Sequence, residues 1–153
     1  LQDQEHIDTS QLVETIILEV KGENPEREIN YSCNNLPPIY NNRPAIKTIF
    51  KELIDNAVTF NQNIVPEINI KYYQQAGRHC FEFQDNGIGI APEFHEQVFG
   101  MFKRLNTRSR YKGAGLGLSM ALKVAKKLHG DLSILRSEEN QGSTFQFTCA
   151  VND

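Results

Sequence analysis

The chain has 153 residues, of which 39% are hydrophobic and 23% are charged, and its formal net charge is −3. This length and composition are typical of one globular domain that buries a core without disulfides or metals, and they exclude a disordered or fibrous chain. Because acidic and basic residues are interspersed, the overall charge gives no reason to expect nucleic acid or an anionic membrane as a partner.

A first helix is predicted directly after Asp8, whose side chain is typical of a helix N-cap. Five apolar residues then recur with helical spacing and form one stripe: Leu12, Val13, Ile16, Ile17 and Val20. Lys21-Gly22 is expected to end this helix. The alternating residues 28–33 predict an edge strand, and residues 34–42, which contain two adjacent prolines, predict a loop.

A second helix is predicted from Pro44, a residue suited to a first helical turn. Its core-facing residues are apolar: Ile46, Ile49, Phe50, Leu53, Ile54 and Ala57. Glu52, Asn56 and Thr59 are spaced by four and three residues, so their side chains are neighbours on the flank of this helix. A carboxylate and an amide one turn apart can hold Mg²⁺, although single polar residues at such positions are more often solvated surface.

Two alternating runs, 64–74 and 79–84, predict a β-hairpin whose second strand ends at Asp85. A short helix is predicted from Pro92 to Val98. Residues 100–113 are polar, basic and without periodicity, which indicates a mobile loop.

A third helix is predicted over residues 116–128, and two strands over 131–136 and 143–151 complete the chain. Helices set apart from antiparallel strands favour an α+β fold. We therefore expect a single domain over residues 1–153: a two-layer sandwich with a mostly antiparallel mixed sheet and helices packed on one face.

Two glycine-rich segments could bind a ligand. In DNGIGI (85–90), the glycines allow close approach of the backbone, and Asp85 can accept a hydrogen bond from an exocyclic amine, although Asp-Asn-Gly is also an ordinary turn signal. In GAGLGL (113–118), free N–H groups at a helix start can bind phosphates. This run follows no strand and lacks Gly-Lys-Ser/Thr, which argues against a Rossmann or P-loop site. Nearby basic residues could also contact phosphates: Lys103, Arg104, Arg108, Arg110 and Lys112.

Taken together, the order and spacing of five segments resemble the catalytic domain of histidine kinases, which has the GHKL or Bergerat fold. Among these kinases, the resemblance is to the phytochrome-like or hybrid sensor kinase type. The segments are FKELIDNAVTF (50–60), DNGIGI (85–90), VFGMFKRL (98–105), GAGLGLSMALKVAKKLHG (113–130) and GSTFQF (142–147). They match the family's N, G1, F and G2 boxes and its closing strand, and the similarity covers nearly the whole chain.

The resemblance implies that ATP and Mg²⁺ bind here, with Asn56 and Glu52 near the metal and Asp85 accepting from the adenine amine. It also implies an ATP lid over residues 100–113, anchored by phenylalanines and carrying Arg104 as its functional charge. Residues expected to shape the adenine pocket or anchor the lid are Phe60, Gly87, Gly89, Ile90, Phe99 and Phe102. Those expected near the phosphates are Lys112, Gly113, Gly115, Leu116, Gly117 and Leu118. Thr144 matches a polar position close to the adenine-binding aspartate.

Two positions depart from the family pattern, since many histidine kinases carry Asn at the place of Glu52 and Lys at the place of Thr59. A glutamate four residues before the asparagine is similar to the ATPases of the gyrase, Hsp90 and MutL type, where it activates water. A GHKL-type ATPase with Glu52 as its base, and a degenerate nucleotide-sensing module, therefore stay open as alternatives.

The resemblance further implies γ-phosphoryl transfer to a histidine on a dimerisation domain outside this chain. The histidines of this chain lack the helical context of a phospho-acceptor and are interpreted as surface or structural residues: His6, His79, His95 and His129. The parent protein is expected to be a homodimer that passes phosphate to a response regulator receiver domain. The isolated domain is expected to be monomeric, with no nucleic-acid partner.

The cysteines Cys33, Cys80 and Cys149 lie far apart in segments that resemble strands. We expect buried, reduced thiols, which favours a cytoplasmic location. No segment resembles a membrane span or a signal peptide, although a membrane anchor elsewhere in the parent protein is compatible with this chain.

Overall fold

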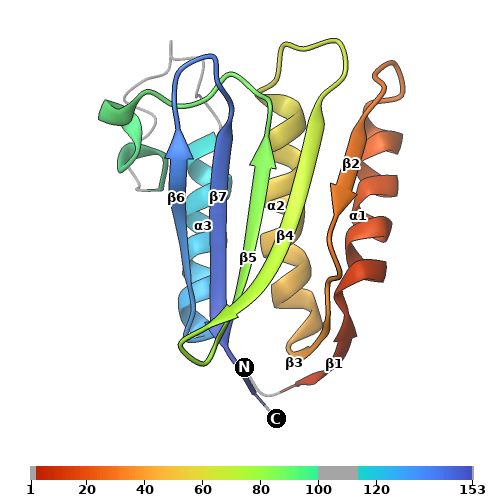
Figure 1. Cartoon of the computed structure of the whole chain (residues 1–153), viewed down its shortest axis with the longest axis vertical. Coiled ribbons are helices and arrows are strands. Elements are labelled where there is room, and N and C mark those ends of the chain that lie inside the picture. Colours follow the sequence, from red (N-terminus) through yellow and green to blue (C-terminus); the bar gives the residue numbers. More distant parts are fainter. Residues whose placement is uncertain (1–2, 100–113, 153) are drawn as a thin grey trace.

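The computed structural model describes residues 3–99 and 114–152 and has two layers, a β-sheet and three α-helices that cover one of its faces (Figure 1). The helices are α1 (Thr9–Glu23), α2 (Arg43–Thr59) and α3 (Ala114–Lys127). The sheet has the order β2-β4-β5-β7-β6. Its strands are β2 (Asn30–Cys33), β4 (Glu67–Gln75), β5 (Arg78–Asp85), β6 (Asp131–Ser137) and β7 (Ser143–Ala150). Strand β2 is parallel to β4 and the other pairs are antiparallel, which confirms the predicted α+β sandwich.

The helix starts follow from side chains that cap free backbone amides. The Asp8 carboxylate accepts a hydrogen bond from the Gln11 amide at 3.0 Å and begins α1, as predicted. Asn42 does the same for α2 by accepting from the Ala45 amide at 2.9 Å. The two caps fix where each helix leaves the preceding strand.

The core lies between the helices and the covered face of the sheet. Phe50 of α2 contacts Phe81 and Phe83 of β5 edge-to-face, with ring centroids 5.2 and 5.1 Å apart. The apolar stripes predicted for α1 and α2 are buried in this layer. Every second residue of β5 and β7 therefore points toward the helices. Only these residues can reach a site between the ends of the strands and the helices.

A small second sheet was not expected from the sequence. Residues 34–42 are predicted as a loop, but β3 (Pro38–Asn41) pairs antiparallel with β1 (Glu5–Asp8), so this prediction is wrong for residues 38–41. Each strand has only four residues and the partners are about thirty residues apart, so neither shows a long alternating pattern. Burial of Ile7 and Ile39 holds the pair against the core.

Three other predictions need correction. The first strand of the hairpin begins at Glu67 rather than Ile64, whose side chain is 92% exposed. The helix predicted from Pro92 to Val98 consists of two short 3₁₀ turns, η1 (Pro92–Phe94) and η2 (Gln97–Phe99). Cys33 is exposed, whereas Cys80 and Cys149 are buried, and all three are free thiols. The predicted loop over 100–113 lies outside the described residues.

Candidate functional site

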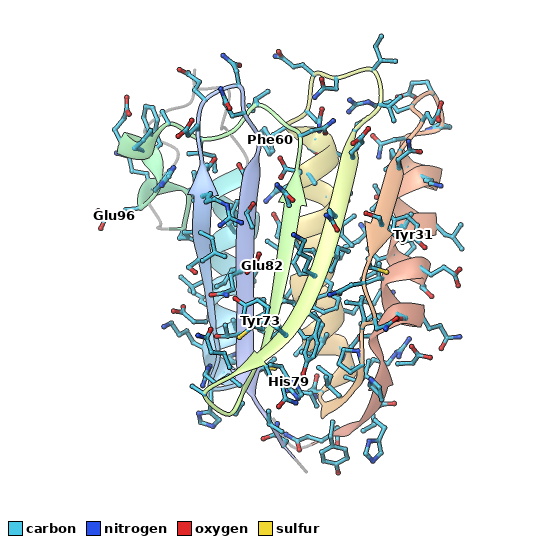
Figure 2. All side chains as sticks on the ribbon, in the orientation of Figure 1. Tyr31, Phe60, Tyr73, His79, Glu82 and Glu96 are labelled. Atoms are coloured by element: carbon cyan, nitrogen blue, oxygen red, sulfur yellow. The ribbon has the colours of Figure 1, made fainter. Side chains whose placement is uncertain are left out.

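A mainly apolar pocket opens where the ends of β5 and β7 meet α2 and α3, with about 370 Å³ of empty space including its mouth. Phe60 follows the last residue of α2 and lies at this end of the sheet, whereas Tyr73 and His79 lie toward the other end (Figure 2). The pocket is lined by Asn56, Phe60, Asp85, Ile88, Gly89, Ile90, Val98, Leu118, Ser143 and Phe145. This lining joins segments that are up to 89 residues apart in the sequence.

Asp85 is the only charged residue among the described residues of this lining. Its Oδ1 accepts hydrogen bonds from the Gly87 amide at 2.9 Å and the Ser143 amide at 3.2 Å. Burial raises the pKa of Asp85 to about 6, although these two N–H donors lower it. Among the described residues, Oδ2 has no hydrogen-bond partner, so it can accept from a ligand that enters the pocket.

The DNGIGI segment is held by the turn between β6 and β7. Gly89 has φ +72°, and a Cβ at this position would collide with the backbone carbonyl of Glu138, so only glycine fits. The Asn140 amide donates to the Ile88 carbonyl at 2.5 Å, and the Ile90 amide donates to Ser137 Oγ at 2.7 Å. The glycine segment therefore has a fixed shape, set by contacts with residues 47 to 52 positions later in the sequence.

The opposite wall of the glycine segment is formed by the end of α2. The Ile88 amide donates to the Phe60 carbonyl at 2.9 Å, and a Cβ on Gly87 would lie 2.5 Å from the same oxygen. His95 adds a hydrogen bond of 2.8 Å between its Nε2 and the Ile90 carbonyl, which agrees with a structural role for this histidine. The segment is thus fastened on both sides of the pocket.

Ser143 lines the pocket, whereas Thr144 does not. Thr144 pairs with Gln84 on β5, and its side chain belongs to the other face of the strand. Sequence reasoning missed Ser143, although strand alternation with Phe145 and Phe147, which are buried on the helix side, could have indicated it. Phe145 and Val98 of the lining were also missed.

Glu52 and Asn56 lie one turn apart on α2, as predicted, next to the start of α3. Burial, and then the charge of Asp55, raise the pKa of Glu52 to about 7, while the Asn56 amide and Lys51 lower it. A Cβ on Gly117 would collide with the Glu52 carboxylate, so the absence of a side chain there leaves room for this acid.

The Asn56 amide is unusual because its Nδ2 is buried and forms no hydrogen bond of standard geometry with the described residues. Amide O and N atoms exchange places by a flip of the side chain, so this position can equally present Oδ1. An amide without a hydrogen bond of standard geometry, beside a partly buried carboxylate, fits a hard cation such as Mg²⁺, which takes one or two protein oxygens and keeps several waters. No group of three or more His, Cys, Asp or Glu residues that could hold a metal occurs in residues 3–99 and 114–152.

The remaining predicted residues fall into two groups. Leu118 lines the pocket, and Phe99 in η2 packs edge-to-face on Phe145, with centroids 6.2 Å apart. Gly115 and Leu116 lie in the first turn of α3. Seven predicted residues lie outside the described part of the chain: Phe102, Lys103, Arg104, Arg108, Arg110, Lys112 and Gly113.

Comparison with known proteins identifies the family. Residues 41–153 match the family described as "Histidine kinase-, DNA gyrase B-, and HSP90-like ATPase". The chain therefore belongs to this family, and its relatives include phytochrome-like proteins and sensor histidine kinases. These findings support an ATP-binding catalytic domain of the histidine-kinase type.

Two curated relatives illustrate the similarity. The chain is 32% identical over 146 residues to the phytochrome-like protein Cph1 of Synechocystis sp., covering 95% of this chain and 19% of that protein. It is 31% identical over 133 residues to the histidine protein kinase SaeS of Staphylococcus aureus, covering 84% of this chain and 37% of that protein. The chain thus spans well under half the length of these relatives.

Solved structures share the fold. The mycobacterial sensor histidine kinase MprB aligns with a TM-score of 0.77 and 19% identity, covering 98% of this chain and 99% of that chain. Full-length ShkA, solved in complex with AMPPNP, aligns with a TM-score of 0.79 and 22% identity, covering 98% of this chain and 32% of that chain. In the described part of this chain, no helix combines the length and apolar character that a membrane span requires.

Proposed function

We propose that this chain is a single catalytic domain that binds Mg²⁺-ATP in the pocket at Asp85 and presents the γ-phosphate to a histidine on a dimerisation domain of the parent protein. The observation that carries the proposal is the Asp85 carboxylate, which is fixed by two backbone amides in an apolar pocket whose described lining residues include no cation. An acceptor of this kind fits the exocyclic amine of adenine, while Phe60, Ile90 and other apolar residues suit the purine ring.

The phosphates would extend from this pocket toward the start of α3. Helix N–H groups and the positive end of the helix dipole suit them there, and Gly117 keeps the first turns free of bulk. Asn56, with Glu52 beside it, would hold Mg²⁺, which supplies charge neutralisation at the phosphates when bound. Arg104, Lys112 and Gly113 remain predicted contacts of the lid over residues 100–113.

Phosphoryl transfer requires mainly that the reacting groups are positioned and that the charge on the phosphates is stabilised. This chain would provide both, and the nucleophile would come from the dimerisation domain. The parent protein would then be a homodimer at the cytoplasmic side, with a receiver domain as the acceptor of the phosphate. The domain by itself would be a monomer.

A titration with a fluorescent ATP analogue tests the binding step. Saturable, Mg²⁺-dependent binding that ATP displaces is expected for the unaltered chain, with at least tenfold weaker binding for Asp85→Asn and for Asn56→Ala. Asp3→Asn, the same change at an exposed aspartate, and Asn69→Ala on the uncovered face of the sheet serve as matched controls. A folded chain that binds no nucleotide at millimolar concentration contradicts the proposal.

Transfer itself needs a second assay, in which the chain and radiolabelled ATP are mixed with the histidine domain of the parent protein. Label is expected on the histidine domain only when both parts are present. Label on this chain alone would place the acceptor among its own histidines and refute the division of roles.

Hydrolysis of ATP is a second candidate activity, favoured by the position of Glu52. Its carboxylate is partly buried, lies one turn before Asn56 and occupies the space that a side chain on Gly117 would need at the start of α3, where a water could be activated. If this chain is an ATPase, it releases phosphate without any partner, and Glu52→Gln abolishes the release while nucleotide affinity stays within about threefold. If it is only a kinase domain, phosphate release by the chain alone is negligible.

A further inference from the structure

A hydrogen bond between two asparagine side chains joins two walls of the pocket from behind. Asn61 Nδ2 donates to Asn86 Oδ1 at 2.7 Å, where the loop that follows α2 lies beside the end of β5 (Figure 1). Neither asparagine lines the pocket, but each directly follows a residue that does, Phe60 and Asp85. The bond therefore connects the neighbour of an apolar wall residue to the neighbour of the proposed adenine acceptor.

The contacts of Asn61 fix the orientation of its amide. The side chain is 5% exposed, and its Nδ2 also donates to the Ala57 carbonyl at 3.1 Å, while its Oδ1 accepts from the Asn63 amide at 3.0 Å. A flipped amide would face a carbonyl with an oxygen and an N–H with an amino group, and both contacts would be lost. The Arg27 guanidinium also donates to the Asn61 carbonyl at 2.9 Å. Asn61 is therefore held on its own side and is the donor to Asn86.

The orientation of the Asn86 amide is fixed in the same way. The Glu67 amide donates to its Oδ1 at 2.9 Å, so this atom is the oxygen that accepts from Asn61. A second link lies alongside, since the Ile88 amide donates to the Phe60 carbonyl at 2.9 Å. With two links, the glycine segment cannot rotate relative to the end of α2, whereas the Ile88 link alone would allow it to turn.

Such a rotation would affect the polar contact of a bound base more than its apolar contacts. Hydrogen bonds weaken steeply when donor and acceptor are misaligned, whereas apolar contacts are not directional. A loss of the Asn61 link would therefore act mainly on the Asp85 carboxylate, which stands one residue before Asn86.

We propose that Asn61 is a positioning residue for nucleotide binding: by holding Asn86, it keeps the Asp85 carboxylate in the orientation relative to Phe60 that an adenine amine requires. This inference rests on the proposed ATP site. It assigns a function to a side chain outside all five segments that resemble the family.

The experiment compares ATP with purine riboside triphosphate, an analogue that lacks only the amine on C6, in competition against the fluorescent nucleotide. The ratio of their dissociation constants reports the contact between Asp85 and the amine. The unaltered chain should bind ATP about tenfold more tightly than the analogue, the effect of one hydrogen bond to a charged acceptor. In Asn61→Ala this preference should fall below about threefold, mainly because ATP binds more weakly.

Asn24 offers a matched control, since its side chain makes the same helix-end contact without a link to the glycine segment. Its Nδ2 donates at 2.8 Å to the carbonyl of Val20, four residues earlier, as Asn61 Nδ2 does to Ala57. Asn24→Ala removes this contact from the end of α1, so it should lower stability but leave the preference for ATP unchanged.

Two further variants keep the test decisive if Asn61→Ala does not fold. Asn61→Asp keeps the size of the side chain and the oxygen that accepts from Asn63, but at about pH 8 it cannot donate to Asn86, so the preference should also be lost. Asn86→Ala should lose the preference from the other side. Adding Asn61→Ala to Asn86→Ala should not change the preference further, because both act through the same bond.

A merely structural role for Asn61 predicts that ATP and the analogue weaken equally or not at all, so that their ratio stays that of the unaltered chain. That outcome overturns the inference and leaves the proposed ATP site intact. A folded, unaltered chain that binds neither nucleotide would overturn the proposed function and the inference together.

Discussion

Replacing Asp85 with asparagine should stabilise the domain in the absence of nucleotide, although it should remove nucleotide binding. Among the described residues, the partly buried carboxylate has no other charged side chain in the pocket lining, and only two backbone amides compensate its charge. Asparagine keeps an oxygen that can accept from the same two amides, but it carries no charge. The change therefore removes a desolvation cost rather than a structural contact.

The size of the effect follows from the pKa of Asp85, which burial raises from 3.8 to about 6. The folded state holds this proton more tightly than the unfolded state, so stability is present below pH 3.8 and is lost as the pH rises through 6. The resulting cost is about 1 kcal/mol near pH 4.5 and about 3 kcal/mol near pH 7.5. Asparagine has no such dependence, and any constant cost of the amide cancels between the two pH values.

Urea unfolding followed by circular dichroism suits this comparison, because the chain has no tryptophan. From about pH 4.5 to about pH 7.5, the free energy of unfolding of Asp85→Asn should rise by about 2 kcal/mol relative to the unaltered chain. Asp3→Asn should show no such change, since that aspartate is exposed. With Mg²⁺-ATP at about 100 times its Kd, the unaltered chain should gain about 2.7 kcal/mol and the variant nothing.

A stability difference between Asp85→Asn and the unaltered chain that does not depend on pH would refute the reasoning, because the effect would then be structural. The opposite slope, with the variant gaining stability toward low pH, would mean that Asp85 is stabilised as an anion by a group outside the described residues.

Three further predictions concern the surroundings of the pocket. Gly89→Ala should lower the free energy of unfolding by more than about 2 kcal/mol in urea titrations, because φ is +72° and the new Cβ would collide with the Glu138 carbonyl. Gly22→Ala is the control: nothing lies near a Cβ at this helical position, so the change should be neutral or stabilising. Arg27 donates to three carbonyls beyond or at the end of α2, so Arg27→Ala should cost about 2 kcal/mol in the same assay, and lysine should restore less than half. Asn56→Ala should leave the stability of the nucleotide-free chain within about 1 kcal/mol, since its buried Nδ2 is unpaired, but should abolish the effect of Mg²⁺ on ATP affinity in calorimetry.

The main elements of the fold could be predicted because local patterns and packing agree in them. The apolar stripes of α1 and α2, the Asp8 cap and the hairpin of β4 and β5 all place apolar residues on the covered face. The β1–β3 pair escaped prediction because its stability comes from long-range pairing and burial of Ile7, which four-residue strands do not reveal.

The site shows the same division between local and long-range information. Asp85, Asn56 and the glycines stand in motifs that sequence alone identifies, and Leu118 follows from its place at the start of α3. Ser143 was not among the predicted residues, although its neighbour Thr144 was, because the motif gives the segment, while only the strand register decides which of two adjacent side chains lines the pocket. The hydrogen bond that Ser137 accepts from the Ile90 amide could not be predicted at all, since it joins residues forty-seven positions apart in the sequence.

The contacts of the β6–β7 turn explain how the pocket holds the Asp85 carboxylate in one orientation. The two amides that bind Asp85 Oδ1 come from the glycine segment and from β7, and Ser137 and Asn140 join these two parts. The direction of the free Oδ2 is therefore fixed before a ligand arrives, so no binding energy is spent on ordering it. The remaining desolvation cost of Asp85 is relieved only when a hydrogen-bond donor enters the pocket. Since the β6–β7 turn holds Asp85 in the orientation that such a ligand binds, ligand binding and the stability of this turn are thermodynamically linked.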